Sequence, residues 1–444
     1  MRGGAVRWLS MTTRMVIIGG GPAGHSCAST AARLGADVVV IERDTIGGAA
    51  HLWDCIPSKA MIATGNARQF LRRSARMGLA EVGSDVDLDQ LRDRLKHIES
   101  RLETTVRGLL DSQRVELVDG FGRMVDAHTV VATLPDGTER TFHADVVVLS
   151  TRDAYPPSVM PEHVIVIGSG VTGVEFVHMF ESMGAQVTLV VSRQQVLPQK
   201  DPEVAAALEE DFLRRGVKLF KGARAESIVR EGNEVIVSCD DGRIARGSHA
   251  LLAIGSVPNS DGLCLDDVGV QTDHGYVPVN NHMQSNIPHI YAAGDLSGRL
   301  PLSSVATMQG RKIAEHAMGL TARGNDRQID YDKAASAIFT EPEIADVGLA
   351  EIDAFAEGRK VRVTKVPFAT HAKALINDDP RGFVKIISDP ATGVILGGSI
   401  VGRHAAELIS VLAVAVTNGL TVTDIHESML VHPTLAEALT EAAE

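Results

Sequence analysis

The sequence predicts an α/β protein that contains the same βαβ unit twice, followed by a separate module of strands and helices. Residues 14–43 and 162–193 carry this prediction. Each segment combines an apolar strand, a glycine turn, a helix, a Gly-Ala turn and a second apolar strand. From about residue 333 onward this pattern does not recur: residues 381–402 predict two strands joined by a turn, and residues 406–420 predict an apolar helix. We therefore expect an α+β C-terminal domain, suited to dimerisation.

Composition narrows the class of protein before any motif is considered. The 444 residues include 43 Lys and Arg and 56 Asp and Glu, which leaves a net charge of −13 at pH 7. This acidic balance argues against a nucleic-acid partner, which would need a basic surface. Four irregularly spaced cysteines make neither a disulfide framework nor a zinc site, and no run of about 18 apolar residues could span a membrane. We expect a cytoplasmic protein with no metal site and no membrane partner.

The turn of each βαβ unit has a fixed glycine spacing. The glycines are Gly19, Gly21 and Gly24 in the first unit, and Gly168, Gly170 and Gly173 in the second. In this spacing the first glycine makes a tight turn, the second lets a pyrophosphate approach the backbone, and the third lets the helix pack against the strand. The helix N-terminus then faces the phosphate charge. Two such copies predict two Rossmann-like dinucleotide-binding domains, in which Pro22, Ala23, Val171 and Thr172 are also expected to contact ligand.

The ends of the second strands differ between the units. Glu42 ends the first unit, where a carboxylate accepts hydrogen bonds from the ribose hydroxyls of FAD or NAD. The equivalent position of the second unit is Val191, followed by Ser192 and Arg193. With no carboxylate to repel a 2′-phosphate, this site favours NADPH over NADH; alternatively, Arg193 is a solvated loop residue.

Two later segments extend the nucleotide sites. Residues 251–259 and 290–298 each predict a strand that runs into a glycine turn, at Gly255 and Gly294. Asp295 lies at the second turn, where its carboxylate could hold a ribityl hydroxyl or, alternatively, cap the following helix. Two dinucleotide sites on one chain indicate a flavin that exchanges electrons with a nicotinamide.

The remaining N-terminal half predicts simpler elements. Residues 85–113 predict a long charged helix, and residues 115–148 predict strands with a turn at Asp136-Gly137. Residues 1–13 contain no apolar signal region and predict a flexible tail, so translation could start at Met11.

Taken together, the motifs resemble those of the pyridine nucleotide–disulfide oxidoreductases, the group of lipoamide dehydrogenase, glutathione reductase and mercuric reductase. The resemblance runs from about residue 14 to 440. It includes both glycine fingerprints, IPSKA at 56–60, AAGD at 292–295 and HPTLAEAL at 432–439. It implies a homodimer in which His432 serves the partner's active site.

The resemblance also implies a domain order. We expect an FAD-binding domain at 14–153, an NAD(P)-binding domain at 154–270, a central domain at 271–332 and an interface domain at 333–444. For the FAD site it adds Arg43, Gly47, Gly48 and Thr151, and Arg152 replaces a glycine that the family usually has after the threonine.

One cysteine of the family's redox pair is missing. The family pattern before IPSK is Gly-Gly-x-Cys-x-x-x-x-Cys, and alignment on Gly47, Gly48 and Cys55 puts Ala50 at the first cysteine. A disulfide reductase needs both thiols, one to attack the substrate and one to resolve the mixed disulfide. Ordinary disulfide reductase activity is therefore not expected.

Two stretches instead resemble relatives that have lost part or all of this pair. Residues 51–60 are similar to the corresponding stretch of the soluble transhydrogenases. Residues 300–317 resemble both these transhydrogenases and actinobacterial NAD(P)H quinone reductases. The second group tends to lose the terminal histidine, whereas this chain keeps His432.

The resemblance also implies roles for further residues of these motifs. Lys59 and Glu175 are implied to pair beside the flavin N5, where a cation favours the anionic reduced flavin; otherwise they are ordinary surface charges. Cys55 is either a thiolate donor to the flavin or a small buried filler. His432 and Glu437 fit a general acid/base oriented by a carboxylate, or a relic that packs the interface.

The predicted function is an FAD-dependent oxidoreductase that passes hydride from NADPH or NADH to a quinone-like small acceptor. The alternatives are a soluble transhydrogenase, a single-cysteine disulfide reductase and, from another class, a non-enzymatic FAD-binding regulator.

Overall fold

The computed structural model describes residues 12–48, 50, 55–80, 83, 85–150, 160–320 and 327–444. The expected flexible tail lies mostly outside these residues, as do Thr151 and Arg152. The chain forms two compact units. Unit 1 comprises Met1–Pro57, Arg92–Pro156 and Ser256–Tyr331, and unit 2 comprises Ser58–Leu91, Pro157–Gly255 and Asp332–Glu444.

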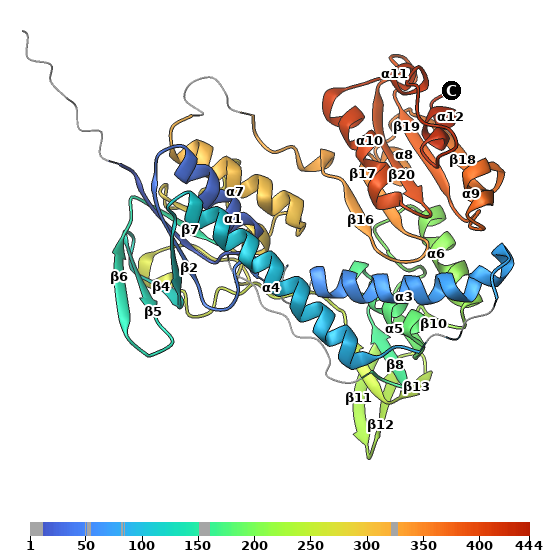
Figure 1. Cartoon of the computed structure of the whole chain (residues 1–444), viewed down its shortest axis with the longest axis horizontal. Coiled ribbons are helices and arrows are strands. Elements are labelled where there is room, and N and C mark those ends of the chain that lie inside the picture. The colour runs from blue at the N-terminus through green and yellow to red at the C-terminus, as the bar shows by residue number, and fades with distance from the viewer. Residues whose placement is uncertain are drawn as a thin grey trace, which may run out of the picture. The chain divides into compact units, whose positions relative to one another are not determined.

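Unit 1 is built on a parallel sheet with the strand order β15-β7-β1-β2-β3. Its central strands are apolar almost without interruption, which is typical of strands buried on both faces. Helices α1 and α7 lie side by side on one face, and the antiparallel sheet β4-β5-β6 covers the other (Figure 1). The elements are β1 (Arg14–Ile18), α1 (Pro22–Arg33), β2 (Asp37–Glu42), β3 (Glu116–Asp119), β4 (Phe121–Asp126), β5 (Thr129–Thr133), β6 (Glu139–His143), β7 (Val146–Leu149), η2 (Asp266–Val268), β15 (Ile290–Ala292), η3 (Gly294–Ser297), α7 (Ser303–Ala317) and η5 (Tyr331–Lys333), the last of which continues into unit 2.

The first half of unit 2 repeats this design with a smaller parallel sheet, ordered β10-β9-β8-β14. An antiparallel sheet, β11-β12-β13, packs beside it through a shared apolar core. The elements are β8 (His163–Ile167), α5 (Val171–Met183), β9 (Gln186–Val191), α6 (Pro202–Arg214), β10 (Lys218–Lys221), β11 (Ala225–Glu231), β12 (Glu234–Cys239), β13 (Ile244–Gly247) and β14 (His249–Leu252).

The C-terminal part of unit 2 is an antiparallel sheet with the order β16-β17-β20-β19-β18. Helices α10 and α12 share one apolar core with this sheet. The two strands expected within 381–402 and the helix expected at 406–420 are confirmed as β19, β20 and α10. The elements are β16 (Ser336–Ile338), β17 (Ile344–Gly348), α8 (Glu351–Ala356), β18 (Arg362–Pro367), η6 (Phe368–Thr370), α9 (Ala372–Ile376), β19 (Phe383–Ser388), β20 (Ile395–Val401), α10 (Ala405–Asn418), α11 (Val422–His426) and α12 (Glu437–Ala442).

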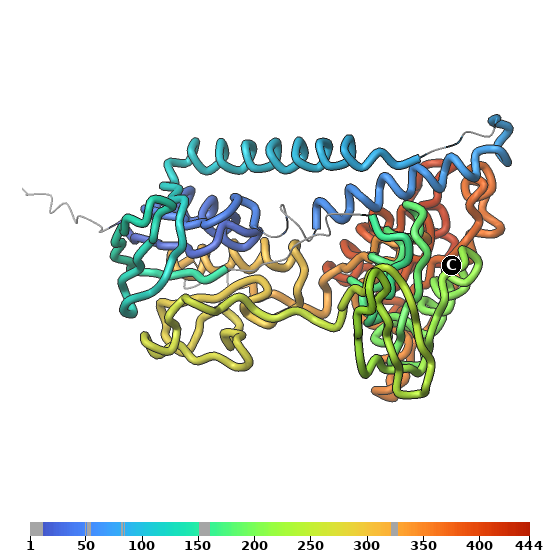
Figure 2. The backbone as a smooth tube through the Cα atoms, turned by 90° about the horizontal axis from the view of Figure 1, so that it is seen from below, coloured from blue at the N-terminus to red at the C-terminus, as the bar shows by residue number. Residues whose placement is uncertain are grey.

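Two long helices complete the described chain. The charged segment expected at 85–113 forms α4 (Leu88–Ser112), a long straight helix in Figure 2. Helix α3 (Ile56–Ser74) carries the IPSKA motif in its first turns and ends in a short helical turn, η1 (Ala75–Met77). Within the described residues, no helix is both long enough and apolar enough to cross a membrane. The predicted α/β class with two parallel sheets of Rossmann-like design and an α+β C-terminal domain is confirmed.

Candidate dinucleotide sites and redox centre

The first glycine fingerprint forms an open helix N-terminus at the end of β1. Gly19 has a φ of 101°, and Gly21 occupies the N-cap of α1. A Cβ on Gly24 would lie 1.9 Å from the Gly19 carbonyl oxygen, so only glycine allows this helix to approach the strand. Among the described residues no side chain caps α1, which leaves its first N–H groups available to an anion.

Glu42 closes this site at the end of β2. Its Oε2 accepts the Gly20 N–H at 2.7 Å, and its Oε1 accepts the Asp44 N–H at 2.9 Å. Burial raises the pKa of Glu42, although these two N–H groups act in the opposite direction. The carboxylate therefore holds the fingerprint turn in place, in addition to the ribose contact expected of it.

The residues after Glu42 fold back onto the fingerprint. Arg43 pairs with Asp44 at 3.1 Å. The Gly47 N–H donates to the Gly20 carbonyl at 2.9 Å, and a Cβ on Gly48 would lie 2.9 Å from the Gly21 Cα. Gly47 and Gly48 thus pack directly against Gly20 and Gly21 of the fingerprint turn, as the resemblance implies for one cofactor site.

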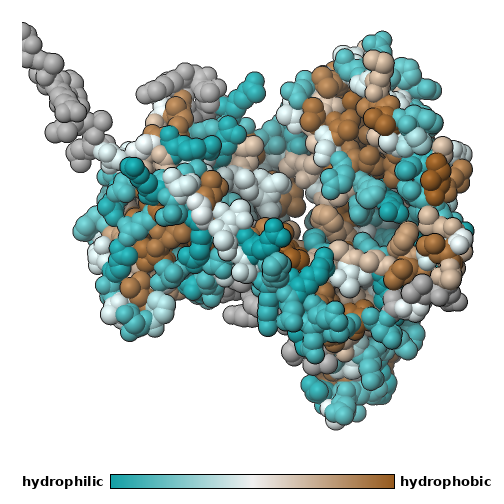
Figure 3. Space-filling view, in the orientation of Figure 1, coloured by the Kyte–Doolittle hydropathy of each residue, from teal (hydrophilic) through white to brown (hydrophobic). Residues whose placement is uncertain are grey.

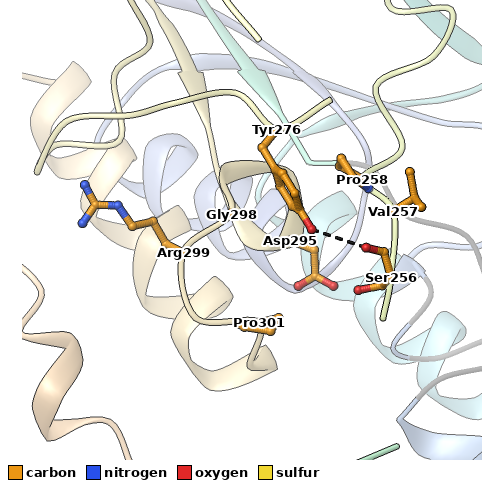
Figure 4. Close-up of a pocket in the computed structure, with 8 residues that line it drawn as sticks. All are labelled: Ser256, Val257, Pro258, Tyr276, Asp295, Gly298, Arg299 and Pro301. Carbon is orange, nitrogen blue, oxygen red and sulfur yellow. Dashed lines mark hydrogen bonds between the residues drawn. The ribbon is translucent and has the colours of Figure 1, made fainter. Parts of the chain in front are cut away.

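Asp295 lies in the short helix η3 and lines a small pocket of unit 1 (Figure 4). The other lining residues are Ser256, Val257, Pro258, Tyr276, Gly298, Arg299 and Pro301. The Tyr276 hydroxyl donates to the Ser256 carbonyl at 3.4 Å, whereas the Arg299 side chain points away from the pocket. Leu302, not Asp295, occupies the N-cap of α7, so Asp295 does not cap that helix. A carboxylate at a pocket wall can accept a hydrogen bond from a ligand hydroxyl.

The second fingerprint repeats the first in its backbone geometry. Gly168 has a φ of 110°, Gly170 occupies the N-cap of α5, and a Cβ on Gly173 would lie 2.0 Å from the Gly168 carbonyl oxygen. Val171 and Thr172 are exposed in the first turn of α5, where within the described chain no side chain caps the helix. Both glycine cradles therefore fit a dinucleotide pyrophosphate.

The strand ends of the second site carry no carboxylate. Val191 is buried, and Ser192 and Arg193 are exposed beyond it. Arg193 makes no ion pair with any described residue, and its carbonyl accepts the Gly222 N–H at 2.9 Å. The turn after β14 contains Gly255, whose φ of 135° is one that glycine adopts readily.

Lys59 and Glu175 form an ion pair in unit 2. The Lys59 Nζ lies 2.6 Å from the Glu175 Oε2, and their side chains are 26% and 9% exposed. The Phe339 N–H donates to the other carboxylate oxygen at 2.9 Å, and the Lys59 Nζ lies 5.2 Å from the Phe339 ring centroid. The structure thus brings together two residues that the resemblance implies as partners, and adds Phe339. No sequence signal could single out Phe339, because any non-proline residue can donate its N–H.

His432 and Glu437 also lie together. The His432 Nδ1 is 2.7 Å from the Glu437 Oε1, and the Thr434 N–H donates to Oε2 at 2.9 Å. The Thr434 N–H and the hydrogen bond to His432 lower the pKa of Glu437. A carboxylate can only accept, so it selects the tautomer with a proton on Nδ1 and leaves Nε2 for other contacts.

The four cysteines all lie in the described part of the chain, and none is in a disulfide. Cys55 directly precedes α3 and is half-buried. Cys27 is fully buried in α1, and burial raises the pKa of its thiol to about 12, which disfavours the reactive thiolate. Ala50 is described but residues 51–54 are not, and within the described residues no three metal-ligating side chains cluster.

Comparison with known proteins agrees with this geometry. Residues 13–310 match the pyridine nucleotide-disulphide oxidoreductase family, and residues 334–443 match its dimerisation domain. The chain is 40% identical to a Mycobacterium tuberculosis protein named NAD(P)H dehydrogenase (quinone), over 98% of this chain and 94% of the relative. It is 30% identical to a dihydrolipoyl dehydrogenase from Zymomonas mobilis, over 96% of each chain.

Among solved structures, LpdA from Mycobacterium tuberculosis superposes with a TM-score of 0.90 at 40% identity, covering 97% of this chain and 99% of that one. The flavoprotein disulfide reductase RclA from Escherichia coli superposes with a TM-score of 0.86 at 23% identity, covering 98% and 99%, and shares the fold. Membership of the matched family implies a flavin and a pyridine nucleotide as cofactors. The chain belongs to the pyridine nucleotide-disulphide oxidoreductase family.

Proposed function

We propose that the chain is an NAD(P)H:quinone reductase that passes electrons through FAD to a quinone-like small acceptor without a redox-active disulfide. The observation that carries the proposal is Ala50, which replaces the first redox cysteine while both glycine cradles and the Lys59–Glu175 pair are intact. The 40% identity to a protein named NAD(P)H dehydrogenase (quinone) supports the same acceptor.

The first glycine cradle would hold FAD, in a domain spanning residues 14–153 with help from residues 271–332. The N–H groups of α1 would bind its pyrophosphate, Glu42 its adenosine ribose and Asp295 a ribityl hydroxyl. Arg43, Gly47, Gly48, Thr151 and Gly294 would complete the site. When bound, FAD supplies the hydride-accepting chemistry, which the side chains of the protein lack.

The second cradle would hold NADPH, in a domain spanning residues 154–270. Arg193 is exposed and makes no ion pair among the described residues, and no carboxylate ends β9, so a 2′-phosphate would meet attraction rather than repulsion. Lys59, in turn, would place a cation beside the flavin, where it stabilises negative charge that develops on reduction. Glu175 keeps that ammonium paired and therefore tolerable in a half-buried position.

Proton delivery to the acceptor would come from His432 of a second copy. Glu437 fixes the orientation of the His432 ring. Val431, which precedes His432 in the chain, is 71% exposed, and Met429 is 99% exposed. Figure 3 shows apolar surface over α10 on the same C-terminal domain, where Val414 is 58% exposed. Exposed apolar side chains that gather on one domain are typical of an interface, and residues 333–444 would form the homodimer contact.

The decisive experiment mixes the purified yellow protein with NADPH and follows its oxidation with two acceptors in parallel, a soluble naphthoquinone and a chromogenic NAD⁺ analogue. Rapid turnover with the quinone and slow turnover with the analogue is the expected result. The reverse ranking would instead assign a soluble transhydrogenase, and a yellow protein that turns over with neither acceptor would favour the non-enzymatic FAD-binding regulator.

A Cys55→Ser variant distinguishes the remaining alternative. Quinone turnover should persist within about threefold, since reduced FAD can donate directly to a quinone. A single-cysteine disulfide reductase would lose its disulfide turnover entirely, because only a thiolate can attack a disulfide.

A further inference from the structure

A third residue, Phe339, contacts both members of the Lys59–Glu175 ion pair. A lysine side chain has four rotatable bonds and loses considerable freedom when it is held in one position. The partner of Lys59, Glu175, is held at both carboxylate oxygens. The Lys59 ammonium donates to Oε2, and the Phe339 N–H donates to Oε1. The carboxylate therefore cannot swing away without breaking a hydrogen bond to the backbone at residue 339.

The Phe339 ring supplies the second restraint. The Lys59 Nζ lies 5.2 Å from the ring centroid, within the range where an ammonium is attracted by the negative face of an aromatic ring. The ammonium is thus held by a carboxylate and by a ring, and both lie outside α3, the helix that carries it.

The segment that carries Phe339 is itself anchored by charges. Two residues on, the Glu341 carboxylate lies 3.0 Å from the Arg73 guanidinium and 2.6 Å from that of Arg381. Arg381 also pairs with the buried Asp379 at 2.6 Å. Breaking a buried network of this kind is costly, so the segment has little freedom to move.

We infer that Phe339 is a positioning residue for Lys59, and that its ring sets how strongly the Lys59 ammonium stabilises reduced flavin. The inference rests on the proposed function, because it takes Lys59 to act on bound FAD. Since the Phe339 N–H survives any non-proline substitution, side-chain variants test the ring separately from the hydrogen bond.

The test compares Phe339→Leu with Phe368→Leu in the FAD-loaded protein. Phe368 is fully buried in the same C-terminal domain and belongs to its apolar core, so its loss reports general destabilisation. We expect Phe339→Leu to slow flavin reduction at saturating NADPH by about 3- to 10-fold while KM changes by less than twofold. The midpoint potential of bound FAD should fall by about 15 to 30 mV, which is the same fold-change converted for a two-electron couple.

Phe339→Tyr, which keeps an aromatic ring, should retain the wild-type rate of flavin reduction and the wild-type midpoint potential. Phe368→Leu should lower the melting temperature without moving the potential. Equal potential shifts in the two Leu variants, or no shift in Phe339→Leu, would overturn the inference.

A ring-fluorinated phenylalanine at position 339 keeps the shape while weakening the negative face, so it decides the matter if Phe339→Leu does not retain FAD. A graded fall in potential with fluorination supports the positioning role, and an unchanged potential refutes it. The inference and the proposed acceptor also fail separately. A wild type that NADPH reduces but quinones do not reoxidise contradicts only the acceptor, whereas Lys59→Met with an unaltered flavin potential contradicts the positioning role.

Discussion

The two glycine fingerprints share one backbone design and differ at the strand that follows. In both, a Cβ added to the third glycine would clash with the carbonyl oxygen of the first glycine. The distance would be 1.9 Å at Gly24 and 2.0 Å at Gly173. At the strand ends, however, Glu42 is held by two backbone N–H groups, whereas Val191 leads to the exposed Ser192 and Arg193. Under the proposed function, phosphate binding would be a property of the shared backbone, and the choice of nucleotide would depend on a few side chains at the strand ends.

Replacing the third glycine should break each site separately and with the largest effect. Gly24→Val is expected to abolish FAD retention, because the side chain cannot fit against the Gly19 carbonyl. Gly173→Val should leave a yellow protein whose reduction by NADPH is lost. The ratio of flavin to protein absorbance and stopped-flow reduction measure the two outcomes.

Gly170→Ala is the matched control, since Gly170 has a φ of −71° and a Cβ there would meet nothing within 4 Å in the described structure. It should leave the melting temperature unchanged and raise only the KM for NADPH. Loss of FAD in Gly173→Val would contradict the separation of the two sites.

Arg193→Ala should sharpen the contrast between the strand ends. Removal of a charge-assisted contact to a 2′-phosphate is expected to raise the KM for NADPH by about 10-fold or more, with little effect on NADH. The measurement is the ratio of kcat/KM for the two nucleotides. Lys218→Ala removes an exposed like charge from the opposite end of the neighbouring strand β10 and should leave the ratio unchanged. Equal losses for both nucleotides would show that Arg193 does not read the phosphate.

The smallest expected effect is on the pH dependence of stability. Burial raises the pKa of Glu42 in the folded apoprotein, so the folded state binds this proton more tightly than the unfolded state does. Stability contributed by Glu42 is therefore greatest at low pH. It declines as the pH rises above the ordinary glutamate pKa of about 4.3, which applies to the unfolded state, and through the raised pKa of the folded state.

Glu42→Gln, which can still accept the Gly20 N–H, should flatten this decline, as chemical denaturation of the apoprotein between about pH 4 and pH 7 would show. Val191 at the equivalent strand end has no proton to exchange, so Val191→Ala should shift stability by the same amount at every pH. A pH slope that Glu42→Gln leaves unaltered would contradict the assignment.

The local parts of the two sites were predictable because their signals are local. Apolar runs, glycine spacing and the residue at each strand end lie within about 30 residues, and the structure places them as βαβ units with these turns. The long helix α4 and the C-terminal strands β19 and β20 follow from periodicity in the same way. By contrast, the sequence offered two interpretations of Asp295, and the structure excludes its capping of α7 because Leu302 holds that N-cap.

The sequence by itself determined the fold class, the repeat, the two glycine turns and the absence of a cysteine at Ala50. Only the tertiary structure decided that the Phe339 N–H and ring meet a pair formed by residues 59 and 175, because these contacts join segments more than 100 residues apart. It also decided that the Glu42 carboxylate supports the fingerprint turn. Contacts of this kind depend on how whole sheets and helices pack, and a backbone N–H that any residue can provide leaves no mark in the sequence.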